Sequence, residues 1–166
     1  AAIARELRGQ IRAGRETGSS RGMAPGLLQC NLVILPERSA FDFMRYCQRN
    51  QRACPLIDVG DPGDPVPHRL APGADIRTDV ARYAVYRKGQ REEDRTDIVD
   101  LWRDDLVAFY IGSGITFDGP LNAAGVQTER YRWVLGTQIP TRPAGPFRGP
   151  LVVTMRWLTA AETITA

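Results

Sequence analysis

The sequence predicts an α+β fold, a mixed sheet with flanking helices, and three observations lead to it. Short apolar runs bounded by turn residues alternate with segments of helical periodicity. The chain has 166 residues, enough for one domain with a buried core. Hydrophobic residues make up 43% and charged residues 25% of the chain, as in ordinary globular proteins. We therefore expect a single domain over residues 1–166.

The first third of the chain predicts a helix, a strand and a second helix. Apolar residues recur at every fourth position over residues 3–11, which is typical of one helix face. Residues 32–35 are apolar and partly β-branched, and they predict a buried strand. Ser39 stands three residues before Asp42, as in a capping box, so a helix should follow over residues 40–49.

The middle of the chain predicts strands. Residues 56–59 form a second short apolar run, and the proline-rich residues 60–75 after it predict an ordered loop. A third strand is expected at residues 83–87, with Lys88-Gly89 as its turn. The continuous apolar run within residues 104–112 predicts a fourth strand.

The last third predicts a helix, a strand and the beginning of another helix. Residues 117–124 predict a short helix that starts near Gly119, because Pro120 suits a first turn. Residues 151–157 alternate as a strand does. Thr159 and Glu162 repeat the capping-box spacing, so a helix begins there. Because no residue after it ends this helix, we expect the chain to be a truncated part of a larger domain.

The charge balance argues against a nucleic-acid binder. The chain has 22 Lys+Arg against 19 Asp+Glu, and Lys88 is its one lysine. The arginines are scattered, with acidic residues close to most of them, whereas a nucleic-acid binder concentrates them in a stripe. Two interpretations remain: a solvated, arginine-rich surface, or a few arginines that bind a carboxylate or phosphate in bidentate geometry.

Several other classes of protein are excluded by composition. No apolar run approaches the roughly 20 residues that cross a bilayer. Three cysteines cannot all pair, so free thiols in a reducing compartment, the cytoplasm, are expected. A single His makes a zinc site or a His-dependent triad hard to build, and we expect neither a metal nor a cofactor.

Four segments are candidates for chemistry, each with an ordinary alternative. Gly112-Ser113-Gly114 after a strand could form an anion-binding nest or only a tight turn. Asp75, Arg77 and Asp79 alternate, so an extended chain would place a guanidinium between two carboxylates, as a site or as an ion-pair ladder. Asp104-Asp105 could be an acid/base pair with separated pKa values, or a cap. The Pro- and Gly-rich residues 141–150 predict a stiff loop that holds two arginines.

Five segments together resemble a known family over nearly the whole chain. They are similar to a bacterial family of hydro-lyases that is related to mitochondrial D-glutamate cyclase. This resemblance implies an enzyme that removes water from a small carboxylate. For the related cyclase, the reaction is the closure of D-glutamate to 5-oxo-D-proline. Family members are usually longer than this chain. The segments are residues 22–36, 45–65, 70–89, 96–112 and 142–156.

Two positions depart from the family pattern. The resemblance implies cysteines where this chain has the hydroxyl residues Ser113 and Thr141. If those cysteines are required, the protein has a different substrate or no activity. The alternative to an enzyme is therefore a non-catalytic binding protein for a small carboxylate metabolite.

Dehydration of a small acid needs proton transfer, cations for the carboxylate and hydrogen-bond donors for an oxyanion. Asp, Arg, Asn and Thr can supply these without His, Cys or a metal. Beyond the small-molecule carboxylate we expect no nucleic-acid or membrane partner, and a homo-oligomer is left open. The candidates are Asp75, Asp104 and Asp105 for proton transfer, Arg77, Arg142 and Arg148 for the carboxylate, and Asn31, Ser113 and Thr116 for hydrogen bonds.

Overall fold

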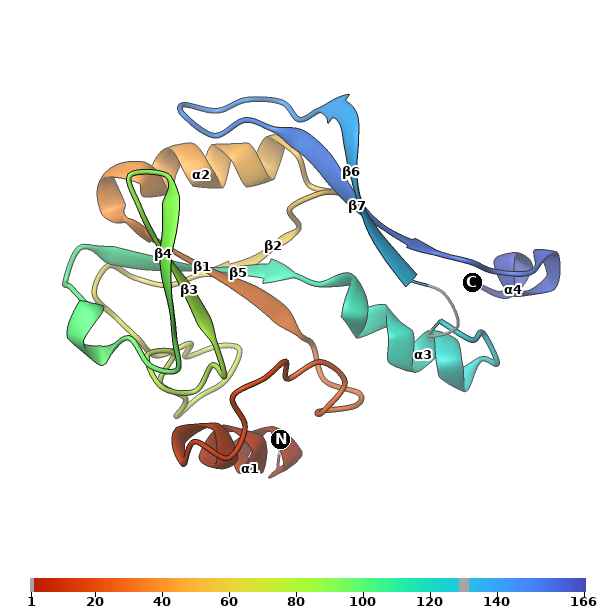
Figure 1. Ribbon diagram of the computed structural model, residues 1–166, viewed down its shortest axis with the longest axis horizontal. Helices are drawn as coiled ribbons and strands as arrows, with labels where there is room; N and C mark the ends of the chain where they lie inside the picture. The colour runs from red at the N-terminus through yellow and green to blue at the C-terminus, as the bar shows by residue number, and fades with distance from the viewer. Residues whose placement is uncertain (1, 129–131) are drawn as a thin grey trace. The chain divides into compact units, whose positions relative to one another are not determined.

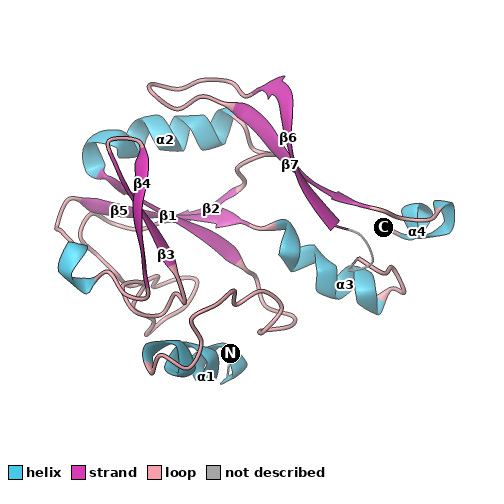
Figure 2. Ribbon diagram, viewed as in Figure 1, coloured by secondary structure: helices cyan, strands magenta, loops and turns pink. Residues whose placement is uncertain are grey.

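The structure is a computed structural model that describes residues 2–128 and 132–166, and its chain divides into two compact units (Figure 1). The first unit comprises Ala1–Pro25 and Gly60–Ala108, and the second comprises Gly26–Val59 and Phe109–Ala166. The α+β class is confirmed, since helices accompany strands in both units (Figure 2). The strands form three separate sheets, and every strand pair with a given register is antiparallel.

The first unit contains helix α1 (Ala2–Arg12), the hairpin of β3 (Tyr83–Arg87) and β4 (Gln90–Arg95), and the short 3-10 helix η1 (Val99–Leu101). The predicted helix, strand and Lys88-Gly89 turn are confirmed. Lys88 and Gly89 have φ values of 50° and 79°, the left-handed conformation that two-residue hairpin turns require. Strand β4 was not predicted, because its sequence QREEDR is fully polar and its pairing with β3 determines it.

The core of the first unit forms around the proline-rich loop. The buried phenol of Tyr83 donates a hydrogen bond to the Ile76 carbonyl at 2.7 Å, which joins the loop to β3. Burial raises the pKa of Tyr83, so the phenol stays protonated as a donor. The indole of Trp102 donates to the Gly63 carbonyl at 2.9 Å. The predicted ordered loop is thus fixed by side-chain donors from later in the chain.

The second unit is organised by a three-stranded sheet in the order β1 (Cys30–Pro36), β5 (Leu106–Gly112), β2 (Leu56–Val59). The chain passes from the first unit to the second within β5, all of whose residues except the last are buried. A fully apolar run is expected of such a central strand. Helix α2 (Glu37–Arg49) packs its buried Phe43 edge-on against Phe109 of β5, with the ring centroids 4.9 Å apart.

Helix α2 begins earlier than the capping-box spacing predicts. Pro36 is its N-cap, and the cap makes no side-chain hydrogen bond, so Ser39 and Asp42 lie inside the helix. The prediction of a capping box there was wrong, because proline directly before Glu37 already sets a backbone conformation that starts a helix. Asp42 instead pairs with Arg45 at 3.3 Å.

The remainder of the second unit has two short helical segments, a two-stranded ribbon and a final helix. The predicted strand near residue 151 is confirmed, whereas β6 was not predicted because its apolar side chains stay exposed. The Thr159–Glu162 capping box is confirmed by both hydrogen bonds, at 3.2 and 2.8 Å. The elements are η2 (Gly114–Phe117), α3 (Asp118–Ala123), β6 (Arg132–Pro140), β7 (Pro150–Arg156) and α4 (Ala160–Thr165).

Two further findings concern the described residues alone. No helix among them has the length and apolarity that crossing a membrane requires. No group of three or more His, Cys, Asp or Glu side chains among them could hold a metal ion.

All three thiols are free, and burial raises the pKa of Cys47 to about 11, with the neighbouring thiol of Cys54 adding to the effect.

Candidate functional site

A pocket of about 360 Å³ lies in the second unit, where the end of α2 meets the last residues of β6 and the start of the loop to β7. Its lining comes from residues 48–53 and, about 90 residues later, from residues 139–142 and Leu151 of β7, so the fold and not local sequence creates it. The lining residues are Gln48, Arg49, Asn50, Gln51, Arg52, Ala53, Ile139, Pro140, Thr141, Arg142 and Leu151.

Three arginines give this pocket its chemistry. Arg49, Arg52 and Arg142 are all exposed, and none of them makes an ion pair within the described residues. The described lining contains no Asp or Glu. Three guanidinium groups without a carboxylate create a positive potential that favours an anion. Since guanidinium is a fork of donors, a carboxylate or a phosphate fits it in bidentate geometry.

Asn50 fixes the position of Arg142 against the helix end. Its side-chain amide accepts from the Arg142 amide N–H at 2.8 Å and donates to the Arg142 carbonyl at 2.9 Å. The same amide donates to the Tyr46 carbonyl of the last helical turn at 2.8 Å. The guanidinium of Arg49 donates to the carbonyl of Pro143 next in the loop. Hydrogen bonds therefore fix the backbone of Arg142 and tie the Arg49 side chain to the loop, which holds the two sides of the pocket together.

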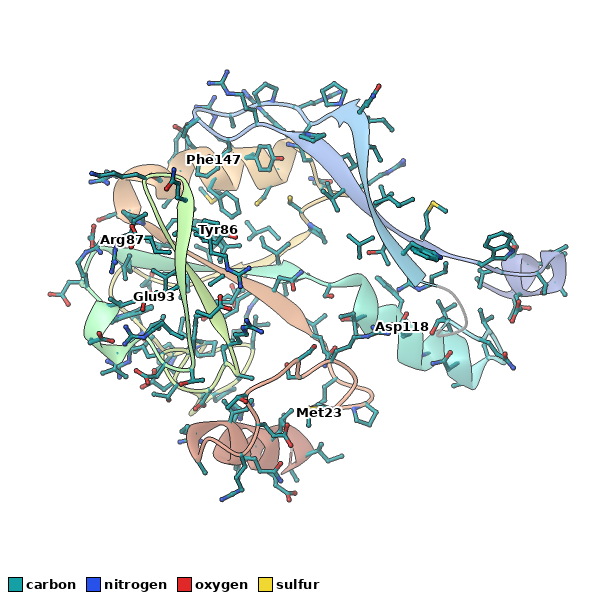
Figure 3. The ribbon with its side chains drawn as sticks, in the orientation of Figure 1. Met23, Tyr86, Arg87, Glu93, Asp118 and Phe147 are labelled. Carbon is teal, nitrogen blue, oxygen red and sulfur yellow. The ribbon has the colours of Figure 1, made fainter. Side chains whose placement is uncertain are left out.

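Thr141 continues this network on the loop side. Its hydroxyl donates to the Gly149 carbonyl at 2.7 Å and accepts from the Tyr46 phenol at 3.0 Å. The predicted stiff loop is supported by these bonds and by the backbone bridge between Ala144 and Phe147. Figure 3 shows the labelled Phe147 ring directed at α2, where its centroid lies 5.1 Å from that of Phe43.

The predicted residues Arg142 and Arg148 are separated by the structure. Arg142 lines the pocket, whereas Arg148, though on the same loop, is exposed and is absent from the lining. Asn31 is an exposed residue of β1 and is also absent from the lining. Of the nine residues that the sequence proposes for a site, the pocket therefore includes Arg142.

The alternation of Asp75, Arg77 and Asp79 does not place an arginine between two carboxylates. The segment is a turn, in which Arg77 forms a bidentate pair with Asp75 alone, at 2.9 and 2.7 Å. The prediction of a shared side was wrong, because it required an extended chain. Hydrogen bonds from the Arg77 guanidinium lower the pKa of Asp75, which is therefore an ionised carboxylate at neutral pH and a poor general acid.

Asp79 has a partner that local sequence could not identify. The Arg12 guanidinium of α1 lies 2.8 Å from one carboxylate oxygen and that of Arg8 lies 3.6 Å from the other. The Asp79 side chain is 2% exposed. A buried carboxylate with two cations and a hydrogen bond from the Asp75 amide at 3.0 Å joins α1 to the loop.

The remaining predicted carboxylates lie at the surface of the first unit. Asp105 pairs with Arg103 at 2.8 Å, and both side chains are about half exposed. Asp104 is exposed and directly precedes it. These carboxylates and Asp75 belong to the first unit and the pocket belongs to the second. Their role in proton transfer stays a prediction.

Gly112-Ser113-Gly114 forms a helix start and no anion nest. The Gly112 amide donates to the Pro55 carbonyl at 2.8 Å and the Ser113 amide donates to the Gln29 carbonyl at 3.2 Å. Neither glycine has a positive φ, as a nest would need. The Ser113 hydroxyl accepts from the Ile115 amide at 3.4 Å as the cap of η2. Thr116 exchanges hydrogen bonds with the Gln29 backbone, so it and Ser113 hold η2 to the residue before β1.

An ion pair that the sequence analysis missed lies at the other end of the ribbon. Arg156 of β7 donates to Asp118 of α3 at 2.7 and 3.0 Å and to the Gly114 carbonyl at 2.8 Å. The Asp118 side chain, labelled in Figure 3, belongs to α3. It is 9% exposed. In the sequence, Asp118 could be recognised as an acidic residue at a predicted helix start. Its partner Arg156 could not, because it lies 38 residues further along the chain. This pair joins α3 to the ribbon.

Comparison with known proteins connects this geometry to a family. Residues 107–166 match the model of the family described as D-glutamate cyclase. This segment belongs to the D-glutamate cyclase family. The resemblance inferred from the sequence is confirmed. The family segment contains β6, β7 and the Thr141-Arg142 side of the pocket, as well as the Asp118–Arg156 pair.

Relatives named "Putative hydro-lyase" extend the similarity beyond this family segment. The protein of Rubrobacter xylanophilus is 49% identical over 160 residues, which are 92% of this chain and 61% of the relative. The protein of Bacillus licheniformis is 46% identical over 166 residues, or 97% of this chain and 63% of the relative. The protein of Bordetella petrii is 48% identical over 162 residues, or 95% and 61%. The chain therefore spans about three fifths of the length of these relatives.

Proposed function

We propose that this protein is a hydro-lyase that removes water from a small carboxylate, and that the pocket at the end of α2 binds the carboxylate group. The observation that supports it is the arginine set of the pocket, Arg49, Arg52 and Arg142, with no acidic residue in the described lining. The family match and the printed name of the relatives point to the same class of reaction.

D-Glutamate is the substrate we propose to test first. In its cyclisation the amine nitrogen attacks the γ-carboxyl carbon, a C–N bond forms, and the γ-carboxyl group loses an oxygen that leaves as water. The product is 5-oxo-D-proline, and no oxidant or cofactor is consumed. The α-carboxylate keeps its charge throughout, so bidentate donors that hold it would position the amine without taking part in proton transfer.

The individual residues of the pocket have distinct roles in this proposal. Arg142 would hold the carboxylate, because Asn50 fixes its backbone from both the amide and the carbonyl side. Arg52 would add a second guanidinium, since no residue of the described chain occupies it as an ion pair. The amide of Gln48 or Gln51 would supply neutral hydrogen bonds to the rest of the ligand.

A second candidate is a protein that binds the carboxylate without turning it over. One observation favours it: the described lining contains no Asp, Glu, His or Cys to transfer a proton. A threonine, Thr141, stands in the lining where the resemblance implies a cysteine. In this alternative the same arginines bind the ligand and the reaction step is absent.

One assay distinguishes the two candidates. The purified chain is incubated with D-glutamate and with a panel of small hydroxy and amino acids, and mass spectrometry follows the loss of one water. Water loss supports the hydro-lyase. Thermal stabilisation by a carboxylate without water loss supports the binding protein. If neither water loss nor thermal stabilisation is observed, both candidates are contradicted.

The pocket itself is tested by Arg142→Ala. A hydrogen bond to a charged group contributes about 1.5–3 kcal/mol, so KM or Kd for the carboxylate should rise roughly 10- to 100-fold. Arg38→Ala is the matched control, because Arg38 is an exposed arginine of α2 outside the lining. If both variants bind like the unaltered protein, Arg142 has no part in the site.

A further inference from the structure

The pocket at the end of α2 has a single hydroxyl group among the side chains that the structure describes around it, that of Thr141. The other polar side chains of this lining are guanidinium and amide groups, and neither kind gives up a proton at neutral pH. Loss of water requires a group that protonates the departing oxygen. Of the described lining, Thr141 alone carries an O–H group for this step.

The Thr141 hydroxyl is a weak acid by itself, but its oxygen is bonded to a titratable group. The Tyr46 phenol donates a hydrogen bond to the Thr141 hydroxyl oxygen at 3.0 Å. Tyrosine is one of the side chains that serve as general acid or base in enzymes. The two residues are 95 positions apart, on α2 and on the loop after β6, so the fold places the phenol behind the pocket hydroxyl.

Aromatic packing fixes the Tyr46 phenol in this position. The centroid of its ring lies 6.3 Å from that of Phe43 and 6.2 Å from that of Phe147. Phe43 is buried and packs against Phe109 of β5, so the phenol is held by a ring anchored in the core of the unit. A fixed donor is what transfer of a proton in a defined geometry requires.

The Thr141 hydroxyl can turn toward a ligand without breaking the loop. In the structure it donates to the Gly149 carbonyl at 2.7 Å, and the same carbonyl accepts from the Thr141 backbone amide at 2.9 Å. A hydroxyl hydrogen rotates about its C–O bond, so it can leave the carbonyl for an oxygen in the pocket. The Gly149 carbonyl then keeps the amide as its partner.

We propose that Thr141 is the catalytic acid of the hydro-lyase reaction and that Tyr46 acts through it by resupplying its proton, an arrangement we call the relay. This inference rests on the proposed function, because it assigns the proton transfer that the reaction needs. It also gives the phenol of Tyr46 a role beyond packing.

The relay accounts for the protons in the cyclisation of D-glutamate. As the C–N bond forms and the C–O bond breaks, the departing γ-carboxyl oxygen takes the Thr141 proton. Thr141 takes the phenol proton in turn, and the phenol regains a proton that the amine nitrogen releases. The ammonium group of D-glutamate loses two protons in all. Both leave with the oxygen as water, and the relay carries one of them.

Removal of either O–H group tests the relay, with D-glutamate as the probe. Tyr46→Phe and Thr141→Val should each lower kcat roughly 100-fold or more, since general acid–base catalysis contributes about 10²–10⁴-fold. KM should stay nearly unchanged, because neither variant removes an arginine of the pocket. Thr141→Ser keeps the hydroxyl and should retain activity. Tyr86→Phe is the matched control, because Tyr86 is an exposed tyrosine of β3 in the first unit.

A fluorinated tyrosine in place of Tyr46 separates proton transfer from a structural role. Ring fluorine makes a phenol more acidic and keeps the O–H group that donates to Thr141. The basic limb of the profile of kcat against pH should therefore move to lower pH, whereas a structural hydrogen bond would leave it in place. The charged side chains on the two elements around the phenol are the same in both proteins: Asp42, Arg45 and Arg49 on α2, and Arg142 and Arg148 on the loop.

The outcomes distinguish the relay from the proposed function. If the unaltered chain turns over D-glutamate and Tyr46→Phe keeps its kcat, or the fluorinated protein keeps its pH profile, the relay is overturned and the hydro-lyase proposal stands. A rise in KM with unchanged kcat in Tyr46→Phe would likewise overturn the relay and leave Tyr46 a packing residue of the loop. If the unaltered chain releases no water from D-glutamate or the panel of acids, both proposals fail.

Discussion

In the first unit Arg8 and Arg12 converge on the carboxylate of Asp79, whose side chain is 2% exposed, whereas in the second unit Arg49, Arg52 and Arg142 line a pocket that has no described carboxylate. The first arrangement pairs its guanidinium groups with a carboxylate of the fold. The second leaves guanidinium groups open to a ligand. The same residue type therefore stabilises one unit and equips the other for binding, and substitutions should separate the two roles.

The largest effect is expected from Asp79→Asn. The change leaves two arginines without their shared carboxylate, and breaking such a buried ion pair costs about 3 kcal/mol or somewhat more. Urea unfolding at neutral pH measures the loss as a lower midpoint. The matched control is Arg52→Gln, which should change the free energy of unfolding by less than about 0.5 kcal/mol. A large loss in the control would show that the pocket arginines also hold the fold together.

For ligand binding we expect the opposite order: a substitution in the pocket weakens binding, and a substitution in the first unit does not. Arg52→Gln should weaken carboxylate binding by about 1.5 kcal/mol, roughly tenfold, because one charge-assisted donor is lost. Titration calorimetry with D-glutamate measures this difference. Arg103→Gln provides the comparison from the first unit and should leave the affinity unchanged. Equal affinities for all three proteins would remove Arg52 from the site.

A smaller effect is expected on the pH dependence of the stability of the fold. The guanidinium of Arg77 lowers the pKa of Asp75 in the folded protein. A carboxyl group with a depressed folded pKa contributes stability above its unfolded pKa, which is about 3.9, and this contribution is lost as the pH falls through the folded value. Arg77→Met should therefore reduce the difference in stability between pH 7 and pH 3. Identical pH profiles of the two proteins would show that the pair contributes nothing to folding.

The smallest effect is expected at the surface pair of Arg103 and Asp105. Both side chains are about half exposed, and such pairs contribute about 0–1 kcal/mol because water screens them. Arg103→Gln should leave the unfolding midpoint nearly unchanged, and added salt should remove any remaining difference. A loss comparable to that of Asp79→Asn would contradict the distinction between buried and exposed arginines.

Most elements could be predicted because their sequence patterns match their environment. The apolar run of β5 predicts a central strand, and Thr159 with Glu162 predicts a capped helix. Strands β4 and β6 could not be predicted in this way. The first is polar and the second exposes its apolar side chains, so pairing with a neighbouring strand determines both.

The candidate site was predictable only in part. The Pro- and Gly-rich composition of its loop pointed to Arg142, and local sequence could go no further. Arg49 and Arg52 follow the pattern of an ordinary solvated helix end, and hydrogen bonds from Tyr46, Arg49 and Asn50 to residues 141–143 bring that end to the loop. Asp79 shows the opposite failure: alternation suggested a local ladder, whereas a turn and a distant helix decided its partners.

Gly145 has a consequence for how this loop can vary. Its φ of 53° is a conformation that favours glycine, and a Cβ built on it would overlap the carboxylate of Asp42. The backbone conformation and the overlap with Asp42 therefore both oppose a side chain at position 145. Relief of the clash by shortening Asp42 would still leave the backbone strained, so a single compensating substitution cannot restore a side chain there. In a saturation library read by binding, position 145 should accept glycine almost alone, while Arg148 three residues later tolerates most replacements.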